Sequence, residues 1–427
     1  MAILQLAMDI FDLERALAIA RDAAKYVDWM EVGTPLIKSE GMNAVREFRR
    51  AFPHKEIVAD MKTMDVGAAE VEMAAKAGAG IVTVMGASDD STIKEAVEAG
   101  KRYGAKIMVD ILGCAPARAR EVEKLGASYL CIHVGIDQQM RGADAMRELH
   151  ALSQKVKIPI AVAGGINSES APLLARAGAS IIIVGGAITK ARNVAKEAES
   201  IRRALASGKP VRAEIKKYGG REIRGAFLRA STPNVSDAMQ RKGEMRGVRA
   251  IVEGVKMVGQ AFTVRTYPGD WAKPVEAVDE AKEGDVLVID SGGVGGGGKA
   301  VWGELATWSC VRKKIAGVVI DGAIRDVDEI RKLKFPAFAR SITPTAGEPR
   351  GMGELRVEIN CGGVSVRPGD WIIGDDNGVV VVPAECALEM ANRALDVLEK
   401  ENRIREEIKK GSTLAKTTYL KKWEKVK

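Results

Sequence analysis

The sequence predicts an α/β protein of two domains, a (β/α)8 TIM barrel followed by a second α/β domain of another type. Within residues 1–190, apolar runs typical of buried strands return about every 25 residues, and amphipathic helical patterns separate them. After a basic segment, the pattern changes to shorter strand-like runs between glycine-rich turns. The chain has 427 residues, of which 46% are hydrophobic, so it can fill two separate cores.

Eight strands are expected in the first domain, residues 1–207. A helix is predicted after the first strand, because Leu13, Leu17 and Ala20 fall on one helical face. Eight such β/α units close naturally into a barrel, and a doubly wound open sheet is the structural alternative. The apolar runs begin at Ile3, Trp29, Ile57, Ile81, Ile107, Tyr129, Ile158 and Ile181.

The rest of the chain divides into three predicted parts. Residues 208–221 form a basic linker, residues 222–385 form the second domain, and residues 386–427 form a C-terminal helix with a basic tail. The helix is expected from about Glu385 to Lys410, where Gly411 ends it.

The composition indicates which classes of partner and which cellular compartment to expect. The net charge of +8 gathers in the linker and the tail, where it is typical of solvated surface, and no RNA-binding motif accompanies it. No run is long and apolar enough for a signal peptide or a membrane span. The five cysteines form no CxxC pair, which indicates reduced thiols. We therefore expect a cytoplasmic protein without membrane or nucleic-acid partners.

Ionisable residues end several of the predicted barrel strands. Side chains at the C-terminal ends of barrel strands converge on one mouth, so polar residues at these positions indicate an active site rather than packing. The residues are Asp9, Glu31, Asp60 with Lys62, Asp110 and His133.

The types of these residues favour enediolate chemistry. The carboxylates of Glu31 and Asp60 can bind Mg²⁺ and leave coordination positions for water and substrate. Strand alternation aims Lys62 to the same side as Asp60, where its ammonium can stabilise an oxyanion, and Asp65 follows in the loop. His133 can move a proton near neutral pH.

Two glycine pairs predict the binding site for a phosphate. Gly164 and Gly165 follow the seventh predicted strand, and Gly185 and Gly186 follow the eighth. In many barrels, backbone N–H groups and a helix N-terminus at these two positions hold a phosphate group.

Residues 1 to about 205 resemble the 3-hexulose-6-phosphate synthase family, which is related to keto-gulonate-phosphate and orotidine-phosphate decarboxylases. The resemblance implies Mg²⁺ at Glu31 and Asp60, and places Asp9, Lys62, Asp65 and His133 around a sugar phosphate. It also implies reversible aldol addition of formaldehyde to D-ribulose 5-phosphate, giving D-arabino-hex-3-ulose 6-phosphate. Decarboxylation of a keto-sugar phosphate is the alternative. The segments that carry the resemblance are QLAMD, EVGTPLI, ADMKTMD, VTVMGAS, MVDILG, IHVGIDQQ, AGGIN and VGGAIT.

The second domain carries a separate constellation. Glu304 begins a helical pattern, and Arg325-Asp326 follows a strand-like run after twenty intervening residues. Arginine beside a carboxylate can be a surface ion pair, or it can be a clamp for a 2-oxo acid beside a carboxylate that binds a metal.

Residues 222–385 resemble the 4-hydroxy-4-methyl-2-oxoglutarate aldolase family, which includes the ribonuclease E activity regulators. The resemblance implies a divalent cation at Asp326, substrate binding by Arg325, a carboxylate pocket at the N–H groups of Leu305 and Ala306, and an acid/base role for Glu304, where the aldolases usually have aspartate. It implies a 2-oxo-acid lyase, either an aldolase or an oxaloacetate decarboxylase. The alternative is a non-catalytic regulatory or oligomerising module. Both resemblances imply a homo-oligomer.

Overall fold

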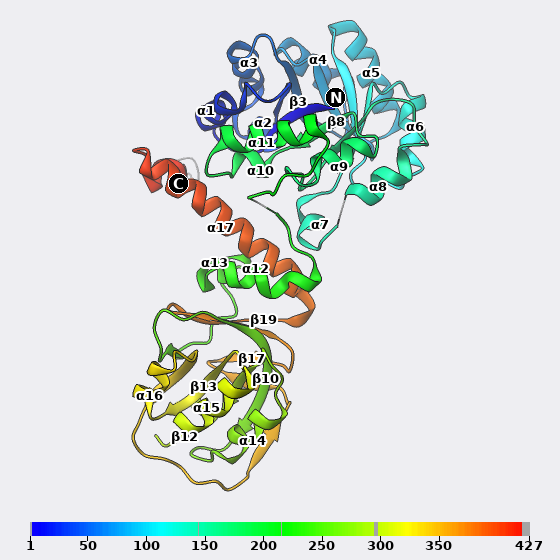
Figure 1. The fold of residues 1–427 in the computed structure, drawn as a ribbon. Coiled ribbons are helices and arrows are strands. Elements are labelled where there is room, and N and C mark those ends of the chain that lie inside the picture. The colour runs from blue at the N-terminus through cyan, green and yellow to red at the C-terminus, as the bar shows by residue number, and fades with distance from the viewer. Residues whose placement is uncertain (1, 144, 215, 294–297, 421–427) are drawn as a thin grey trace, which may run out of the picture. The chain divides into compact units, whose positions relative to one another are not determined.

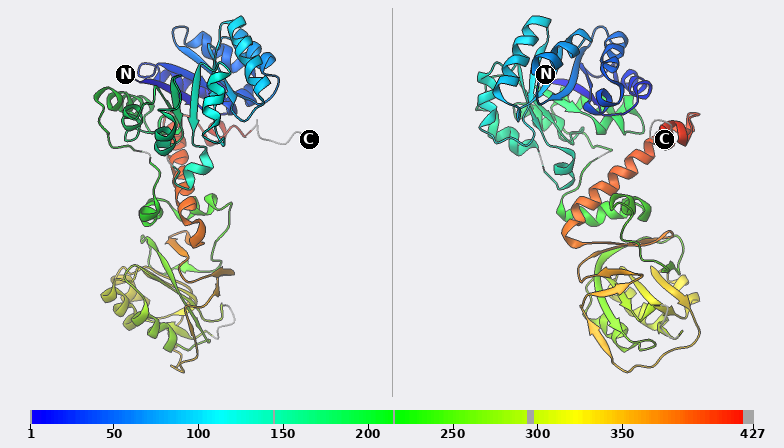
Figure 2. Two further views of the ribbon diagram at one scale, coloured as in Figure 1. Left: turned by 90° about the vertical axis from the view of Figure 1, so that its right-hand side faces the viewer. Right: turned by 180° about the vertical axis from the view of Figure 1, so that it is seen from behind.

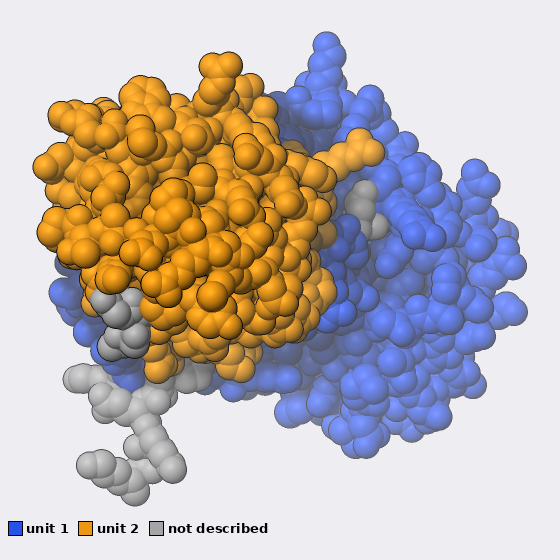
Figure 3. Space-filling model, turned by 90° about the horizontal axis from the view of Figure 1, so that it is seen from below, with its two compact units in different colours: residues 1–217, 399–427 blue, residues 218–398 orange. Residues whose placement is uncertain are grey.

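The computed structural model describes residues 2–143, 145–214, 216–293 and 298–420. The chain forms two compact units, which Figure 3 colours separately. Unit 1 contains residues 1–217 and 399–427, and unit 2 contains residues 218–398. Unit 1 therefore contains residues 208–217 of the predicted linker and residues 399–427 of the predicted tail, together with the barrel.

Unit 1 contains a closed barrel of eight parallel strands, which confirms the predicted fold class (Figure 1). The first strand pairs with both the second and the eighth strand, and this pairing closes the barrel. The strands are β1 (Ile3–Met8), β2 (Trp29–Val32), β3 (Glu56–Thr63), β4 (Ile81–Met85), β5 (Lys106–Asp110), β6 (Tyr129–His133), β7 (Ile160–Ala163) and β8 (Ile181–Val184).

Helices enclose the strands of unit 1, as the two further views show (Figure 2). Side chains such as Leu6, Ile57 and Val82 pack between strands and helices, while Val58, Met108 and Cys131 fill the inside of the barrel. The helices are α1 (Leu13–Ala23), α2 (Thr34–Glu40), α3 (Met42–Ala51), α4 (Gly67–Lys76), α5 (Asp90–Tyr103), α6 (Arg118–Lys124), α7 (Ile136–Met140), α8 (Ala145–Leu152), α9 (Ala171–Arg176), α10 (Gly186–Thr189) and α11 (Val194–Ser207).

The part of the chain after residue 398 also belongs to unit 1, so the long helix α17 begins in unit 2 and ends in unit 1. Helix α17 (Ala387–Lys409) agrees with the helix expected from Glu385 to Lys410, and the short helix α18 (Leu414–Thr417) follows it. Near the end of α17, Glu407 forms an ion pair with Arg15 of α1, with Nη2 and Oε1 3.0 Å apart.

Unit 2 is built on a sheet with a central parallel part. The strand order is β19-β18-β10-β11-β13-β14-β9, with β12 beside β13, β15 beside β10, and a separate β16-β17 hairpin. The strands are β9 (Arg249–Ala250), β10 (Met257–Thr266), β11 (Val286–Asp290), β12 (Ala300–Trp302), β13 (Gly317–Ile324), β14 (Ala337–Ile342), β15 (Gly353–Leu355), β16 (Ile359–Cys361), β17 (Val364–Val366), β18 (Trp371–Asp375) and β19 (Gly378–Val382).

The helices of unit 2 include α12 (Ile223–Arg229), α13 (Thr232–Ala238), α14 (Ala272–Glu280), α15 (Glu304–Lys313) and α16 (Val327–Lys332). Cores lie on both faces of the sheet, so its central strands are buried on both sides and read as continuous apolar runs. Among the described residues, no helix is both long and apolar enough to cross a membrane.

Candidate active sites

The barrel brings the predicted strand-end residues to one mouth. Asp9 follows β1 directly, Glu31 lies in β2, Asp60 and Lys62 lie in β3, Asp110 ends β5, and His133 ends β6. All the strands are parallel, so these C-terminal positions face the same end of the barrel.

Lys62 lies between two aspartates. Its Nζ is 2.8 and 3.1 Å from the two carboxylate oxygens of Asp60 and 3.4 Å from Oδ2 of Asp110. The same Oδ2 of Asp110 is 2.8 Å from Nδ1 of His133. Asp60, Lys62, Asp110 and His133 therefore form one continuous network, and we call it the charge network.

The strand is irregular where it presents Lys62. The register between β3 and β4 shifts between Ala59 and Thr63, and Lys62 has a φ of 49°. Such a bulge changes the direction of a side chain, and bulges are frequent beside active sites. The sequence alternation predicted a regular strand, but the contact between Lys62 and Asp60 forms through this bulge.

Two threonines orient Asp60, and the sequence interpretation missed both. The hydroxyl of Thr34, at the start of α2, donates to Oδ2 of Asp60 at 2.8 Å. The hydroxyl of Thr83 in β4 donates to Oδ1 at 2.6 Å. With Lys62 as a further donor, both oxygens of this buried carboxylate have fixed directions.

Negative charge is concentrated on the other side of Asp60. Burial raises the pKa of Glu31 well above its ordinary value, and the charges of Asp60 and Asp9 add to the shift. Gln5, in the neighbouring strand β1, donates a hydrogen bond to Glu31. Asp9 is exposed on one side, but desolvation at the crowded mouth raises its pKa, and the charge of Asp60 raises it further.

The charge network keeps Lys62 and Asp110 ionised. Burial lowers the pKa of Lys62, but the carboxylates of Asp60 and Asp110 raise it more, so the net shift is upward. Burial raises the pKa of Asp110, but its hydrogen bond with His133 and the charges of His133 and Lys62 outweigh burial and lower it. Lys62 is therefore an ammonium ion and Asp110 a carboxylate at neutral pH.

The crowded carboxylates suit a hard cation. Mg²⁺ commonly takes only one or two protein carboxylates and completes its shell with water and substrate. Glu31 and Asp60 meet this requirement, and a cation would favour the charged form of Glu31, whose pKa is raised by burial and by the charges of Asp60 and Asp9. The described residues form no complete cluster of three or more metal-binding side chains.

The two predicted phosphate-binding loops also lie at this mouth. Gly164 and Gly165, after β7, have φ angles of 111° and 66°, and a Cβ on Gly164 would lie 2.3 Å from the carbonyl oxygen of Val134. After β8, Gly185 precedes α10, whose first-turn N–H groups begin at Gly186. A Cβ on Gly185 would lie 3.6 Å from Oδ2 of Asp9, so this loop adjoins the carboxylates.

Lys190 and Asp65 differ from the sequence interpretation in opposite ways. Lys190 was not predicted, yet its Nζ lies 3.5 Å from the place that a Cβ on Gly186 would occupy, and its charge acts on Asp9. Asp65 is exposed, and its Oδ1 accepts a hydrogen bond from the N–H of Val66. The structure does not bring Asp65 into the charge network, and its role stays a prediction.

Unit 2 brings its three predicted residues together. Oδ2 of Asp326 accepts a hydrogen bond from the N–H of Glu304 at 3.2 Å and lies 3.3 Å from Nε of Arg325. Gly303 permits this approach, because a Cβ there would lie 2.5 Å from Oδ2 of Asp326. Asp326 has a φ of 56° and begins α16, while Glu304 begins α15.

The surroundings of this second site are open. The side chains of Arg325 and Asp326 are 42% and 38% exposed. Leu305 is exposed and Ala306 is buried, and both lie in the first turn of α15, where backbone N–H groups have no partner within the helix. An anionic ligand can therefore reach both Arg325 and these N–H groups.

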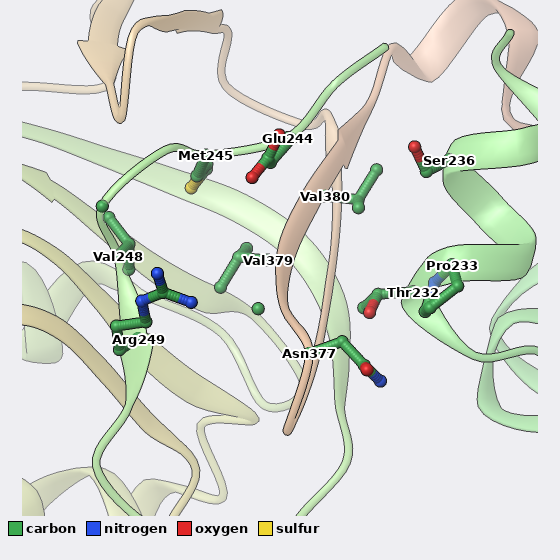
Figure 4. Close-up of a pocket in the computed structure, with 12 residues that line it drawn as sticks. Thr232, Pro233, Ser236, Glu244, Met245, Val248, Arg249, Asn377, Val379 and Val380 are labelled. Atoms are coloured by element: carbon green, nitrogen blue, oxygen red, sulfur yellow. The ribbon is translucent and has the colours of Figure 1, made fainter. Parts of the chain in front are cut away.

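A pocket lies elsewhere in unit 2 (Figure 4). It has a volume of about 200 Å³ and is lined by α13, the segment 244–249, Asn377 in the turn before β19, and the start of β19. Its polar lining residues include Thr232, Glu244 and Arg249, and none of the predicted site residues lines it.

Comparison with known proteins assigns the two halves. Residues 2–201 match the family described as orotidine 5'-phosphate decarboxylase / HUMPS. The 3-hexulose-6-phosphate synthase of Bacillus subtilis (strain 168) is 39% identical over 208 residues, which are 48% of this chain and 99% of that protein. The synthase of Mycobacterium gastri is 42% identical over 205 residues, with the same two shares.

The chain belongs to the 3-hexulose-6-phosphate synthase family. Its synthase half is an enzyme of the carbon–carbon lyase class, as the sequence predicted. A crystal structure of 3-hexulose-6-phosphate synthase is 42% identical, covers 48% of this chain and 99% of its own, and has a TM-score of 0.46.

The other half matches a different family. Residues 232–381 match the RraA-like family, described as Aldolase/RraA, so the predicted fusion is confirmed. The structure of the RNA-processing inhibitor RraA from Thermus thermophilis is 28% identical and covers 36% of this chain and 93% of its own, with a TM-score of 0.33. The synthase relatives match less than half of the chain, because they have no counterpart of this second half.

Proposed function

We propose that the synthase half catalyses the reversible addition of formaldehyde to D-ribulose 5-phosphate, giving D-arabino-hex-3-ulose 6-phosphate. The charge network supports this proposal most directly. It places an ammonium ion, Lys62, beside a histidine that is oriented by a carboxylate, Asp110. Removal of a proton next to a carbonyl group needs such a base and such a positive charge.

In the proposed reaction, Nε2 of His133 takes the proton from C1 of the sugar phosphate. The carboxylate of Asp110 accepts a hydrogen bond from Nδ1–H of His133, so the basic lone pair is on Nε2. Lys62 stabilises the enediolate, whose C1 forms a bond to formaldehyde. The formaldehyde oxygen then receives the proton back from His133.

The remaining residues bind and hold the substrate. Glu31 and Asp60 would hold a divalent cation such as Mg²⁺, which supplies positive charge to the enediolate oxygens when bound. The N–H groups of the two glycine loops bind the phosphate, and the ammonium of Lys190 adds positive charge beside them.

Formaldehyde consumption tests this proposal. Full-length protein with Mg²⁺ is expected to consume formaldehyde only when ribulose 5-phosphate is present, and Lys62→Ala is expected to lower kcat by about 10²–10³-fold. Lys101→Ala is the matched control, because this lysine lies in an exposed ion pair with Glu98 of α5. Release of CO2 from a keto-sugar phosphate without formaldehyde consumption would instead favour a decarboxylase.

We propose that the RraA-like half is a 2-oxo-acid lyase. Its support is the contact of Asp326 with both Arg325 and the N–H of Glu304. In this proposal, Arg325 and the N–H groups of Leu305 and Ala306 bind the substrate. Asp326 would hold the divalent cation, and Glu304 acts as the acid/base group. The negative charge that develops on the pyruvate enolate lies next to Arg325.

Pyruvate release tests the second activity. The full-length protein is expected to release pyruvate from 4-hydroxy-2-oxo acids or from oxaloacetate, and Asp326→Ala is expected to remove this activity. Asp328→Ala is the control, because the side chain of Asp328 is 88% exposed and lies two residues away. Equal pyruvate release by wild type and Asp326→Ala would favour a regulatory or oligomerising module.

A further inference from the structure

The segment that follows α11 lies across two loops of the barrel. This segment, residues 209–214, begins after Gly208, which ends α11 with a φ of 67°. It belongs to unit 1 and carries no motif that the proposed reaction uses. We call it the strap.

One side of the strap is bound to the loop between β7 and α9. The N–H of Val211 donates to the carbonyl oxygen of Ser168 at 3.1 Å. The N–H of Ala213 donates to Oε1 of Glu169 at 3.0 Å. This loop begins with Gly164 and Gly165, so the strap is attached to the first phosphate-binding loop.

The other side of the strap reaches the connection after β8. Oε1 of Glu214 lies 3.5 Å from Nε of Arg192. Arg192 lies between α10 and α11, after the short helix α10 that begins at Gly186. The strap therefore joins the first glycine loop to the segment after α10, the helix that the second glycine pair begins.

The attachment to the first loop is firm. Ser168 is fully buried, and Asn167 is 7% exposed. Oδ1 of Asn167 accepts hydrogen bonds from the N–H groups of Glu169 at 2.9 Å and Ser170 at 3.1 Å. The strap thus connects a buried, hydrogen-bonded part of the first loop to Arg192 after α10.

We propose that the strap positions the two glycine loops for the substrate phosphate, an inference that rests on the proposed synthase reaction. A phosphate bound by both loops requires them to be held at a set separation, and prior ordering reduces the entropy lost on binding. The phosphate is remote from the carbons that react, so the strap affects KM for the sugar phosphate more than kcat.

Two variants of the full-length protein test the strap. Glu214→Gln removes the ion pair with Arg192. Val211→Pro removes the N–H that donates a hydrogen bond to the carbonyl oxygen of Ser168. KM for ribulose 5-phosphate is expected to rise about two- to fivefold in each variant and about tenfold in the double variant, with kcat within about twofold of wild type.

Each variant has a matched control. Asp28→Asn removes a cross-element ion pair that is less exposed than the Glu214–Arg192 pair, in which Asp28 contacts Arg202 of α11 at the opposite end of the barrel. Val211→Ala shortens the side chain but keeps the N–H. Neither control is expected to change KM.

Hydrogen exchange gives a second measurement. Amides of residues 164–170 and 185–193 are expected to exchange faster in the two strap variants than in wild type, and inorganic phosphate is expected to slow their exchange in wild type. The inference is overturned if KM of Glu214→Gln equals that of wild type. It is also overturned if Asp28→Asn raises KM as much as Glu214→Gln does, or if kcat of the strap variants falls by the same factor as KM rises. If wild type shows no turnover, the synthase proposal fails, and unchanged exchange in both variants then overturns the strap as well. If Val211→Pro does not fold, Glu214→Gln alone decides.

Discussion

Asp110 connects the two side chains that perform the proposed proton transfer and charge stabilisation. One of its oxygens contacts both Lys62 and His133, so a single buried carboxylate orients a base and an ammonium ion. The sequence indicated Asp110 as a strand end but assigned it no role, because its partners come from two other strands.

Asp110→Asn is expected to lower kcat about 10²-fold with little change in KM, because the amide can donate to His133 and so favour the wrong tautomer. Steady-state kinetics with ribulose 5-phosphate and formaldehyde measures the effect. Asp90→Asn, which loses only a surface contact with Arg118, is the control. A kcat equal to that of wild type would show that His133 needs no orientation by Asp110.

At the scale of residues, the sequence identified the ionisable side chains at strand ends but missed the side chains that contact them. Glu31, Asp60 and His133 were found because strand ends meet at the mouth of any parallel barrel. Thr34 and Thr83 were missed because a hydroxyl group has no signal in sequence until its acceptor is known. Lys190 was missed because it follows a helix of only four residues.

At the scale of elements, the β7–α9 loop depends on Gly164. Gly164→Ala would combine a φ of 111° with a contact to the Val134 carbonyl oxygen, whereas Gly113→Ala has a φ of 74° and open space around the new methyl group. We expect a loss of about 3 kcal/mol or more for Gly164→Ala and about 1 kcal/mol for Gly113→Ala. Urea unfolding of the barrel measures both, and equal losses would contradict the close approach.

Asp375 joins α13 to β18. Its carboxylate accepts hydrogen bonds from the backbone N–H and the hydroxyl of Thr232, at 2.8 and 2.6 Å. Burial raises its pKa, but these bonds and two further hydrogen bonds from Asn377 lower the pKa more, to about 2. Since the pKa in the unfolded chain is about 3.9, the carboxylate stabilises unit 2 above about pH 4, and this contribution is lost as pH falls toward 2.

Asp375→Asn is therefore expected to destabilise unit 2 by about 1–2 kcal/mol at pH 6, with allowance for partial solvation, and by less at pH 3. Urea unfolding at both pH values gives the difference. Asp279→Asn, at an exposed position of α14, serves as the control. A difference from wild type that is the same at both pH values would contradict the lowered pKa.

The elements themselves were predictable to different degrees. The eight barrel strands are parallel and mostly buried, so they appear in sequence as apolar runs. In unit 2, β9, β12 and β15–β17 have only two or three residues each, too few for a pattern. The bulge at Lys62 was not predicted because no glycine or proline in β3 marks it.

At the scale of the molecule, two compact units imply two unfolding events. We expect calorimetry to show two unfolding transitions. Ribulose 5-phosphate is expected to raise the midpoint temperature of only one of them. At about 100 times Kd the shift is about 5–10 °C. The unshifted transition serves as an internal control. A single transition that moves as a whole would contradict two independently folding units.

The fusion of two families was predictable from motifs, and the family comparisons confirm it. Oligomeric state and compartment are properties of assembly and of the cell, so they stay predictions. The grouping of residues 399–427 with the barrel has no signal in sequence, because this part of the chain is far in sequence from residues 1–217.

Helix α17 has a practical consequence for producing the halves separately. It begins in unit 2 at Ala387 and ends in unit 1 at Lys409. A gene fragment that stops at residue 217 lacks Glu407, the ion-pair partner of Arg15. No single cut therefore releases both units with all of their residues, and a barrel expressed with residues 399–427 requires a circular permutation or a second polypeptide.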